Sequence, residues 1–364
     1  MDYEELIINM GPQHPSTHGV LYLQLKLDGE IVLDCQPNIG YLHRSIEKIA
    51  ENRTLVQFLP FTDRLDYLGA MNNNLSFCLS AEKLLGITAP PRAQYIRVIV
   101  AELNRIASHL FAVSTFAQDL GAYATPLFYA LRDREKIITV FDELCGQRLT
   151  YNYLRIGGLS GDITPKVVQL IKDYIPYQRR MLDEFDQLIT GNIIFNARTE
   201  NIGILPKDVA INFGVTGPVL RASGCKFDLR KDEPYLMYDQ FNFDIPTGRK
   251  GDSRDRYHVR IQEMRESLKI VEQALGGLPE GDPVASINKP FRPSGEVYVR
   301  TENPRGELGF YIVGDGNRFP LRIKVRSPSF ANLSVLPQLV RGLNISDAVC
   351  VLGSLDIVMG EIDR

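Results

Sequence analysis

Hydrophobic and polar residues alternate strictly near the start of the chain. Leucine occupies every second position over residues 21–27, with Tyr22, Gln24 and Lys26 between them, which is the period of a half-buried strand. Asp28-Gly29 then supplies a two-residue turn, and apolar residues at alternate positions over 31–35 suit a partner strand. The pattern predicts a β-hairpin.

From about Gly40 the apolar residues recur every three or four positions, which is the period of a helix. After Pro60, Thr62 or Asp63 can cap a helix. The apolar face of this helix would carry Leu65, Leu68, Met71, Leu75 and Leu79.

Pro90-Pro91 opens another helix, which is apolar on nearly all sides over residues 96–111. A helix of this kind is expected to lie buried in a bundle. An unpaired buried charge costs several kcal/mol or more, so the polar residues of this helix must find partners inside the protein. They are Arg97, Glu102, Arg105 and His109.

Three further helices and a second β region complete the pattern. Helices are predicted at about 126–145, 165–190 and 252–275, the second ended by Gly191 and the third by Gly276-Gly277. The Gly- and Pro-rich stretch 202–251 between them is predicted to be irregular with short strands. Strands are predicted at 297–301, 308–313 and 321–325, separated by strong turn signals.

The fold class is therefore α+β, a central helical bundle with small antiparallel sheets from both ends. Residues 1–39 would form the N-terminal hairpin region, and 40–278 the helical core with an irregular insert at about 202–251. Residues 279–364 would form a C-terminal β-rich region that packs back on the core.

Composition narrows the class of protein. Apolar residues make up 44% of the 364 and charged residues 23%, with a net charge of −3, which is ordinary globular composition and not that of a nucleic-acid binder. No apolar run reaches the 18 residues of a membrane span. The acidic start, residues 1–5, does not resemble a signal peptide, so the chain is expected to remain in the cytoplasm. The five cysteines are far apart, which favours reduced thiols, mostly in the core.

Residues 11–19, Gly-Pro-Gln-His-Pro-Ser-Thr-His-Gly, stand out locally. Two prolines fix the backbone and two glycines permit close approach, so a shaped loop is expected. His14 and His18 have the spacing of a helical zinc pair, but Pro15 opposes a helix and the glutamate of a metalloprotease is missing. Spacing alone favours a structural turn whose histidines bind neighbouring backbone groups.

Asp63-Arg64-Leu65-Asp66-Tyr67 would open the helix predicted after Pro60. Acidic residues in a first turn ordinarily favour the helix dipole, and a tyrosine one turn further is ordinarily a core residue. The functional alternative is that Tyr and His donate hydrogen bonds to a carbonyl oxygen. A quinone has two such oxygens and takes up two protons on reduction to quinol, so a His and a Tyr facing one cavity would suit that reaction.

Other glycine-rich segments point to no cofactor. Residues 155–162 lack both a dinucleotide fingerprint and a P-loop Lys-Ser/Thr, so a turn between helices is expected there. The sequence has no motif that would bind NAD or flavin, and no convincing nucleophile–histidine pair.

Ordered blocks along the whole chain resemble one family, the D-type subunit of NADH–quinone oxidoreductase, or respiratory complex I (the NdhH type in chloroplasts). Each block is weak alone, and together they are specific. They comprise the loop 11–21, Gly40-Tyr41-Leu42-His43-Arg44, Asp63-Arg64-Leu65-Asp66-Tyr67, Pro91-Arg92-Ala93, Arg155-Ile156-Gly157-Gly158, Leu220-Arg221-Ala222-Ser223-Gly224, Asp228-Leu229-Arg230-Lys231, Tyr238-Asp239 and Met359-Gly360-Glu361-Ile362-Asp363-Arg364.

The resemblance implies that quinone enters a cavity between this subunit and its iron–sulfur partner. His18 and Tyr67 match the pair that hydrogen-bonds the quinone head group, and Asp119 matches the carboxylate that pairs with that His. A carboxylate partner would raise the pKa of the His and make it a proton source. Arg44 matches an Arg near the terminal cluster, and His14 and Asp66 are expected around the quinone.

The family is related to the large subunit of nickel–iron hydrogenases, which hold their metal with two Cys-x-x-Cys pairs. Those positions fall on Asp66 and Gly69, and near Val358 and Glu361. None is Cys, so the soft ligands of a nickel–iron centre are absent and no metal is expected in this chain. The hydrogenase fold is expected to be shared.

The resemblance also implies partners and a location. Expected partners are subunits of the B, C, I and H types, of which the B type carries the terminal iron–sulfur cluster and the H type lies in the membrane. Iron–sulfur clusters and FMN are expected in partner subunits, with quinone as substrate. The complex would reduce quinone with electrons from NADH and translocate protons, with this chain peripheral on the cytoplasmic membrane face, or the stromal side in plastids.

Two departures from the family pattern leave alternatives open. Thr150 stands where many relatives have a His near the cluster, and 279–300 is shorter than in many members. The same subunit also works in relatives fed by ferredoxin or F420H2, and a scaffold that only bridges the peripheral and membrane arms is the alternative from another class.

Overall fold

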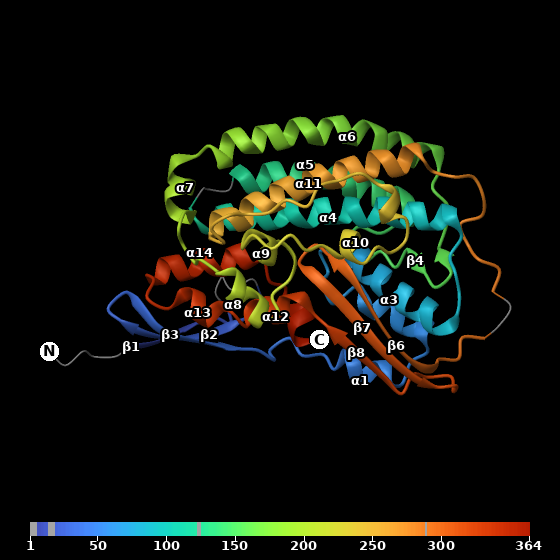
Figure 1. Cartoon of the computed structure of the whole chain (residues 1–364), viewed down its shortest axis with the longest axis horizontal. Helices are drawn as coiled ribbons and strands as arrows, with labels where there is room; N and C mark the ends of the chain where they lie inside the picture. The colour runs from blue at the N-terminus through green and yellow to red at the C-terminus, as the bar shows by residue number, and fades with distance from the viewer. Residues whose placement is uncertain (1–5, 14–18, 122–124, 288–289) are drawn as a thin grey trace.

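The computed structural model describes residues 6–13, 19–121, 125–287 and 290–364. Long helices form one side of the molecule, and two small antiparallel sheets with short helices form the other (Figure 1). The α+β fold class is confirmed. Within the described residues, no helix is long and apolar enough to cross a membrane.

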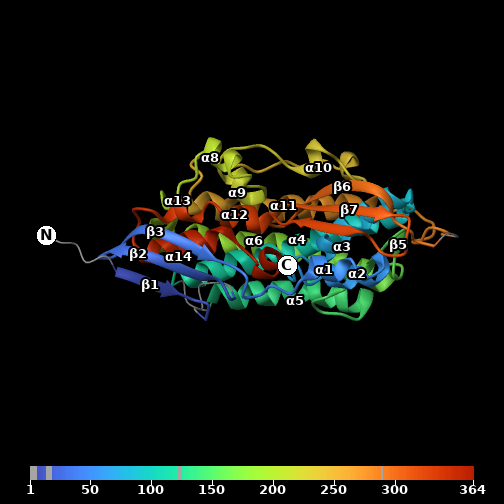
Figure 2. The ribbon, with the colours of Figure 1, turned by 90° about the horizontal axis from the view of Figure 1, so that it is seen from below.

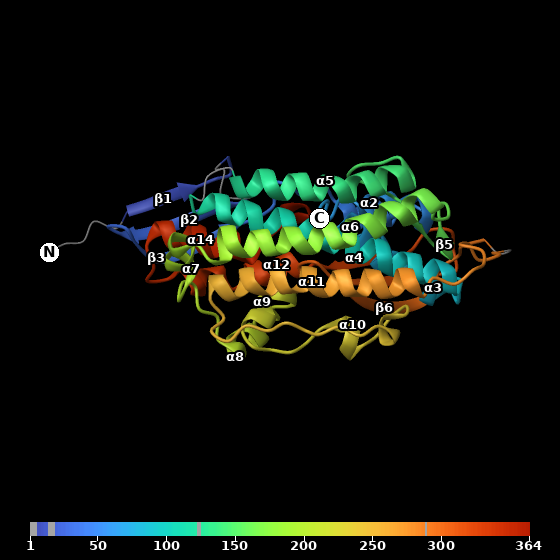
Figure 3. The same cartoon turned by 90° about the horizontal axis from the view of Figure 1, so that it is seen from above.

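The bundle surrounds one buried helix. In the view of Figure 3, α4, α5, α6 and α11 run alongside one another, and α4 is buried along most of its 29 residues, as predicted. Its polar residues have partners inside: Arg97 pairs with Glu82 at 2.5 Å and His109 with Glu263 at 3.0 Å. The long helices are α3 (Ala70–Leu85), α4 (Pro91–Asp119), α5 (Thr125–Cys145), α6 (Pro165–Phe185) and α11 (Ser253–Gly276).

The N-terminal sheet confirms the predicted hairpin and extends it. Strands β2 (Tyr22–Asp28) and β3 (Ile31–Asn38) pair antiparallel, and Gly29 at φ +58° forms the turn. Strand β1 (Leu6–Met10), which the pattern did not predict, pairs with β2 to complete the order β1-β2-β3. Figure 2 shows this sheet at one end of the molecule.

The second sheet has the order β6-β7-β8 and confirms the three predicted strands, β6 (Ser294–Asn303), β7 (Gly306–Asp315) and β8 (Arg322–Arg326). Four short helices, which the sequence pattern did not predict, follow the last strand. The hydroxyl of Ser327 accepts from the backbone N–H of Phe330 and caps the first of them. They are α12 (Pro328–Leu333), α13 (Leu336–Val340), α14 (Ile345–Leu355) and α15 (Met359–Asp363).

Residues 202–251 run across the bundle largely without regular structure, as predicted. The prediction of short strands within them is wrong, because this described segment contains no strand. The segment forms short helices, one of them capped by Asp228, whose carboxylate accepts from the N–H of Arg230 at 2.9 Å. They are α8 (Lys207–Asn212), α9 (Gly217–Ala222), α10 (Leu229–Asp232) and a 3-10 turn, Tyr238–Gln240. Before them lie a small β4–β5 ribbon (Leu154–Arg155, Gly158–Leu159), a π-helical turn (Asp186–Thr190) that continues α6, and α7 (Ile193–Thr199).

The predicted start of the next helix at Thr62 or Asp63 is wrong, although the helix itself exists and contains Met71, Leu75 and Leu79. Helix α1 (Ile46–Ala50) is followed by α2 (Leu55–Thr62), which contains Pro60 and begins at a capping box formed by Thr54 and Gln57. Residues 63–69 form a non-helical link, and α3 begins only at Ala70. Tyr67 therefore lies on the link rather than on a helix.

Two hydrophobic clusters fill the interior. The larger lies among α3, α4, α5, α6, α11 and the second sheet. The smaller joins the first sheet to α9 and the C-terminal helices. The five cysteines are free thiols, three of them buried, as expected. The smaller cluster contains residues from both ends of the chain. The predicted division of the chain at 39 and 278 stays a prediction.

Candidate functional site

Asparagine side chains fix the link between α2 and α3. Asn73 donates to the carbonyl oxygen of Asp66 at 2.8 Å, and Asn104 of α4 donates to that of Leu68 at 2.9 Å. The side-chain oxygen Oδ1 of Asn104 also accepts from the N–H of Met71 at 3.0 Å. These bonds satisfy backbone groups that a helix would otherwise pair, so the link is held in a turn conformation with Tyr67 at its end.

A cavity of about 520 Å³ opens beside Tyr67. It brings together four segments that are far apart in sequence: the link, the C-terminal end of α4, the β6–β7 turn and the connection between α14 and α15. Tyr67 and Asp119, both predicted as site residues, line the same cavity. The lining residues are Tyr67, Leu68, Phe111, Thr115, Gln118, Asp119, Arg305, Asp356, Ile357 and Val358.

Tyr67 is suited to donate a hydrogen bond into this cavity. Its side chain is 38% exposed. Partial burial raises the pKa of its hydroxyl, and the nearby guanidinium of Arg305 opposes that rise. The hydroxyl therefore keeps its proton at neutral pH and is available as a donor.

A buried guanidinium lies behind Tyr67. Arg305 donates to the Asp66 carboxylate at 2.7 Å, to the Asp356 carboxylate at 2.8 Å and to the Ser108 hydroxyl of α4 at 3.0 Å. Burial raises the pKa of Asp66, and Arg305 opposes the rise. Asp66 is thus an ion-pair partner rather than a residue that interacts with a helix dipole.

The turn that carries Arg305 is fixed by a close approach of two backbones. Gly217, at φ +70°, lies so near that a Cβ atom there would be 2.5 Å from the Arg305 carbonyl oxygen. Asn332 of α12 donates to that oxygen at 3.1 Å. The position of Arg305 therefore depends on α9 and α12 as well as on its own hairpin.

Arg44 contacts the same segments without lining the cavity wall. Its guanidinium donates to the carbonyl oxygens of Arg64 at 2.8 Å and Gly360 at 2.9 Å. Partial burial lowers its pKa, and Asp363 opposes that effect. Arg44 thereby joins the link to α15.

His14 and His18 lie outside the residues that the structure describes, so their predicted roles stay predictions. The described chain resumes at Gly19, where a Cβ atom would lie 3.8 Å from the Met359 side chain. Met359 directly follows Val358 of the cavity wall.

The four positions that the sequence comparison with hydrogenases predicts to replace cysteines are Asp66, Gly69, Val358 and Glu361, and they lie in this region. A Cβ atom on Gly69 would lie 2.6 Å from an Asp66 carboxylate oxygen, Val358 lines the cavity, and Glu361 interacts electrostatically with Asp66. Among the described residues, no three His, Cys, Asp or Glu side chains are grouped to hold a metal ion. The expectation that this chain holds no metal stays a prediction.

Three buried charged residues of this region were not singled out from the sequence as site residues: Arg305, Asp356 and Glu361. Arg305 belongs to Asn303-Pro304-Arg305-Gly306, one of the turn signals between the predicted strands. Asp356 and Glu361 lie in an otherwise apolar stretch near the end of the sequence. Acidic residues in a buried apolar segment need partners, and that signal could have identified the pair.

Asp63 is a second buried carboxyl group of the link. It is fully buried, and neither of its oxygens has a hydrogen-bond partner among the described residues. Burial raises its pKa to about 7, opposed by Arg64 and by Asn74 and Arg155 nearby.

We expect Asp63→Asn to stabilise the chain above neutral pH. The folded chain keeps the Asp63 proton up to about pH 7, whereas the unfolded chain loses it near pH 4. The wild-type free energy of unfolding therefore falls as pH rises between those values, and Asn removes that fall. Urea unfolding at pH 8 should show a gain of about 2–4 kcal/mol, which disappears near pH 4. The exposed Asp183→Asn is the control, and no gain for Asp63→Asn at pH 8 would contradict the assignment.

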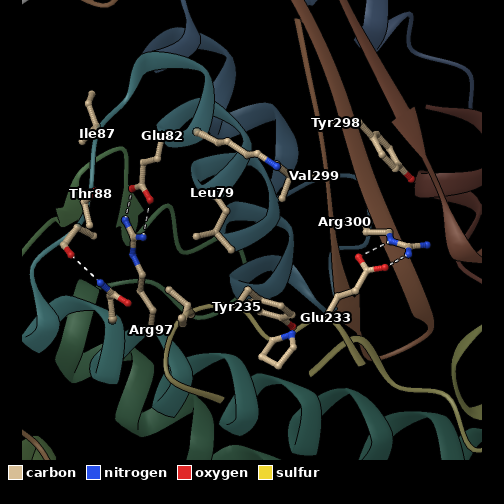
Figure 4. Close-up of a pocket in the computed structure, with 15 residues that line it drawn as sticks. Leu79, Glu82, Ile87, Thr88, Arg97, Glu233, Tyr235, Tyr298, Val299 and Arg300 are labelled. Atoms are coloured by element: carbon tan, nitrogen blue, oxygen red, sulfur yellow. Dashed lines mark hydrogen bonds and ion pairs between the residues drawn. The ribbon is translucent and has the colours of Figure 1, made fainter. Parts of the chain in front are cut away.

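A cavity of about 560 Å³ lies elsewhere, among α3, β6 and the segment 233–236 (Figure 4). Four of its charged side chains form two pairs, Arg97 with Glu82 at 2.5 Å and Arg300 with Glu233. None of the predicted site residues lines this cavity. The Tyr67 cavity, which is lined by two predicted site residues, is therefore the better candidate for chemistry.

Comparison with known proteins gives one consistent result. The family model described as the 49-kDa subunit of respiratory-chain NADH dehydrogenase matches residues 119–291 and 284–364. The D-type subunit of NADH-quinone oxidoreductase from Dehalococcoides mccartyi is 52% identical over 99% of both chains. The D-type subunit numbered 2 in Solibacter usitatus is 53% identical over 100% of this chain and 98% of the relative. The D-type subunit of Bacillus anthracis is 50% identical over 99% of both chains.

Proposed function

The chain belongs to the family of the 49-kDa subunit of respiratory-chain NADH dehydrogenase, the D-type subunit of the multi-subunit NADH-quinone oxidoreductase or complex I, and we propose that it forms one wall of the quinone-reduction site of that complex. The observation that carries this proposal is the cavity that Tyr67 and Asp119 share, with Arg305 in its wall.

The chemistry of these residues suits quinone reduction. The Tyr67 hydroxyl donates a hydrogen bond to one quinone carbonyl oxygen and then a proton, as negative charge develops on that oxygen. Arg305 supplies positive charge behind the tyrosine, which stabilises the developing charge. Electrons come from an iron–sulfur cluster in a partner subunit, so this chain contributes binding and protons.

The second proton donor in this proposal is His18. Asp119 would pair with it and raise its pKa, which makes the imidazolium available near neutral pH. His14, Arg44 and Asp66 would surround the quinone without donating protons to it. The contacts of Asp66 with Arg305, and of Arg44 with the link, agree with supporting roles.

Tyr67→Phe is the direct test. Phenylalanine keeps the ring and removes only the hydroxyl group that donates the proton. General acid catalysis contributes about 100- to 10,000-fold, so quinone reductase activity of the assembled complex should fall at least about 100-fold. The spectroscopic signal of the partner's cluster should persist, because the cluster is not held by Tyr67.

Tyr298→Phe is the matched control, because Tyr298 is similarly exposed, at 44%, and lines the cavity of Figure 4 instead. It should leave turnover unchanged. Wild-type turnover in Tyr67→Phe would remove the role given to that residue. If loss of the chain prevented assembly while His18 and Tyr67 tolerated substitution, the chain would be a scaffold instead.

We propose the surroundings of the subunit from the family. It would contact the iron–sulfur subunit of the B type, subunits of the C and I types, and the membrane subunit of the H type. It would lie at the cytoplasmic face of the membrane, or the stromal side in plastids, and would couple quinone reduction to proton translocation. The names of the relatives favour NADH as donor over ferredoxin or F420H2. Identification of the subunits that copurify with the native complex tests this, since flavin-bearing NADH-oxidising subunits are expected.

A further inference from the structure

Glu361 of α15 is a carboxyl group with an unusual environment. Its side chain is fully buried. One oxygen accepts from the N–H of Ser329 at 3.1 Å and from the Ser329 hydroxyl. The other oxygen has no hydrogen-bond partner among the described residues. A fully buried oxygen without a partner is rare and points to a group that is not ionised.

The nearby cations are directed at other carboxylates. Arg305 pairs with Asp66 at 2.7 Å and with Asp356 at 2.8 Å, and Arg260 lies 3.7 Å from Asp356. Three buried carboxyl groups thus share two guanidinium groups, and within the described part of the chain neither guanidinium bonds to Glu361. An ionised Glu361 would be an uncompensated buried charge, which costs several kcal/mol or more.

Burial and the neighbouring polar and charged groups together set the proton affinity of Glu361. Burial raises the pKa of Glu361 to about 8, and the charge of Asp66 raises it further, while Ser329 and Arg305 oppose the rise. The Arg44 guanidinium is bonded to the adjacent Gly360 carbonyl oxygen rather than to the carboxyl group. The groups that act on Glu361 are Ser329 from α12, Asp66 from the link and Arg305 from the β6–β7 turn.

We propose that Glu361 is a positioning residue of the quinone site. It is a carboxylic acid whose proton prevents a further negative charge beside the ion pairs of Arg305 behind Tyr67. This inference rests on the proposed function of Tyr67. When Glu361 loses its proton to solvent at alkaline pH, the added charge acts on Asp66 and Arg305. It then raises the proton affinity of Tyr67 and disfavours negative charge on the quinone, so proton donation slows.

The pH profile of quinone reduction by the assembled complex tests this. With a pKa of about 8, about a tenth of Glu361 remains protonated at pH 9, so the wild-type rate should fall about 10-fold between pH 6.5 and pH 9. In Glu361→Gln the group is neutral throughout, so the fall between the two pH values should shrink to the part that deprotonation of His18 contributes. A wild-type profile without this fall, or an unchanged fall in Glu361→Gln, overturns the inference.

Ser329→Ala provides a second, independent variant. The Ser329 hydroxyl stabilises the ionised carboxylate, so its removal should move the alkaline fall to higher pH. An unchanged midpoint in Ser329→Ala overturns the inference even if Glu361→Gln fails to assemble. Glu233→Gln, at the cavity of Figure 4, is the control and should keep the wild-type profile. An active Tyr67→Phe would refute the proposed function, whereas an inactive Tyr67→Phe with an unchanged Glu361→Gln profile would refute only this inference.

Discussion

Arg305→Met is expected to lower the free energy of unfolding by about 3–5 kcal/mol and to abolish quinone reduction, because it leaves buried carboxylates without their counter-charge. Asp66 and Asp356, both nearly fully buried, would lose the guanidinium between them. The Ser108 hydroxyl and the Asp356 carbonyl oxygen would lose donors as well. Urea unfolding of the purified chain measures the first effect, and quinone reductase activity of the assembled complex measures the second.

A matched control separates burial from the mere loss of a cation. Arg300, five residues earlier on β6, is 32% exposed and pairs with Glu233 and Glu307. Exposed pairs contribute about 0–1 kcal/mol, so Arg300→Met should change stability by no more than that. Adding Asp356→Asn to Arg305→Met removes one stranded charge and should recover part of the loss. Equal unfolding midpoints for Arg305→Met and wild type would show that the ion pairs of Arg305 with Asp66 and Asp356 do not stabilise the fold.

Local pattern predicted the parts of the fold whose stability is local or periodic. The alternation over 21–27 predicted β2, and the apolar surface of residues 96–111 predicted the burial of α4 and the internal pairing of Arg97 and His109. Strand β1 was missed because it adds to an existing sheet edge through backbone hydrogen bonds. Such bonds leave a weak mark on the side-chain pattern.

The link 63–69 shows where local pattern fails. Its apolar spacing continues into α3, so the sequence favoured one helix from Asp63 onward. The turn exists because Asn104, 36 positions after Leu68, donates to the Leu68 carbonyl oxygen. A contact of that sequence separation cannot be read from the local period. The helices from Pro328 onward were not predicted from the local pattern either.

The candidate site could be predicted only in part for a related reason. Tyr67 and Asp119 were identified by resemblance, and the cavity that contains both is a consequence of how α4 and the link pack. Asp66 was predicted to stand near the quinone, but its pairing with Arg305, 239 positions away, needed the structure. Residues 11–19 were the most distinctive local motif in the sequence, and the role assigned to His18 stays a prediction.

A second large effect is expected at Arg221, in the charged interior between α9, α11 and β6. Its guanidinium lies 2.7 Å from Glu263, 2.8 Å from Glu302 and 3.5 Å from Asp228, all nearly or fully buried. Arg221→Met keeps much of the side-chain volume and removes the charge. Breaking a buried pair in this way costs about 3–5 kcal/mol, which is a large fraction of the roughly 5–15 kcal/mol typical of folded domains.

The pH dependence of that loss distinguishes charge from packing. Burial raises the pKa of Glu302 and Arg221 opposes the rise, so without Arg221 the folded chain would retain protons that the unfolded chain releases near pH 4. The penalty should therefore grow as pH rises from about 4 toward neutrality and be larger at pH 8 than at pH 5. Arg179→Met, whose partner Glu272 is 2.5 Å away with both side chains about half exposed, should show a loss below about 1 kcal/mol at either pH. A loss in Arg221→Met that is equal at pH 5 and pH 8 would assign the role of Arg221 to packing, because only stranded carboxylates make the penalty depend on protons.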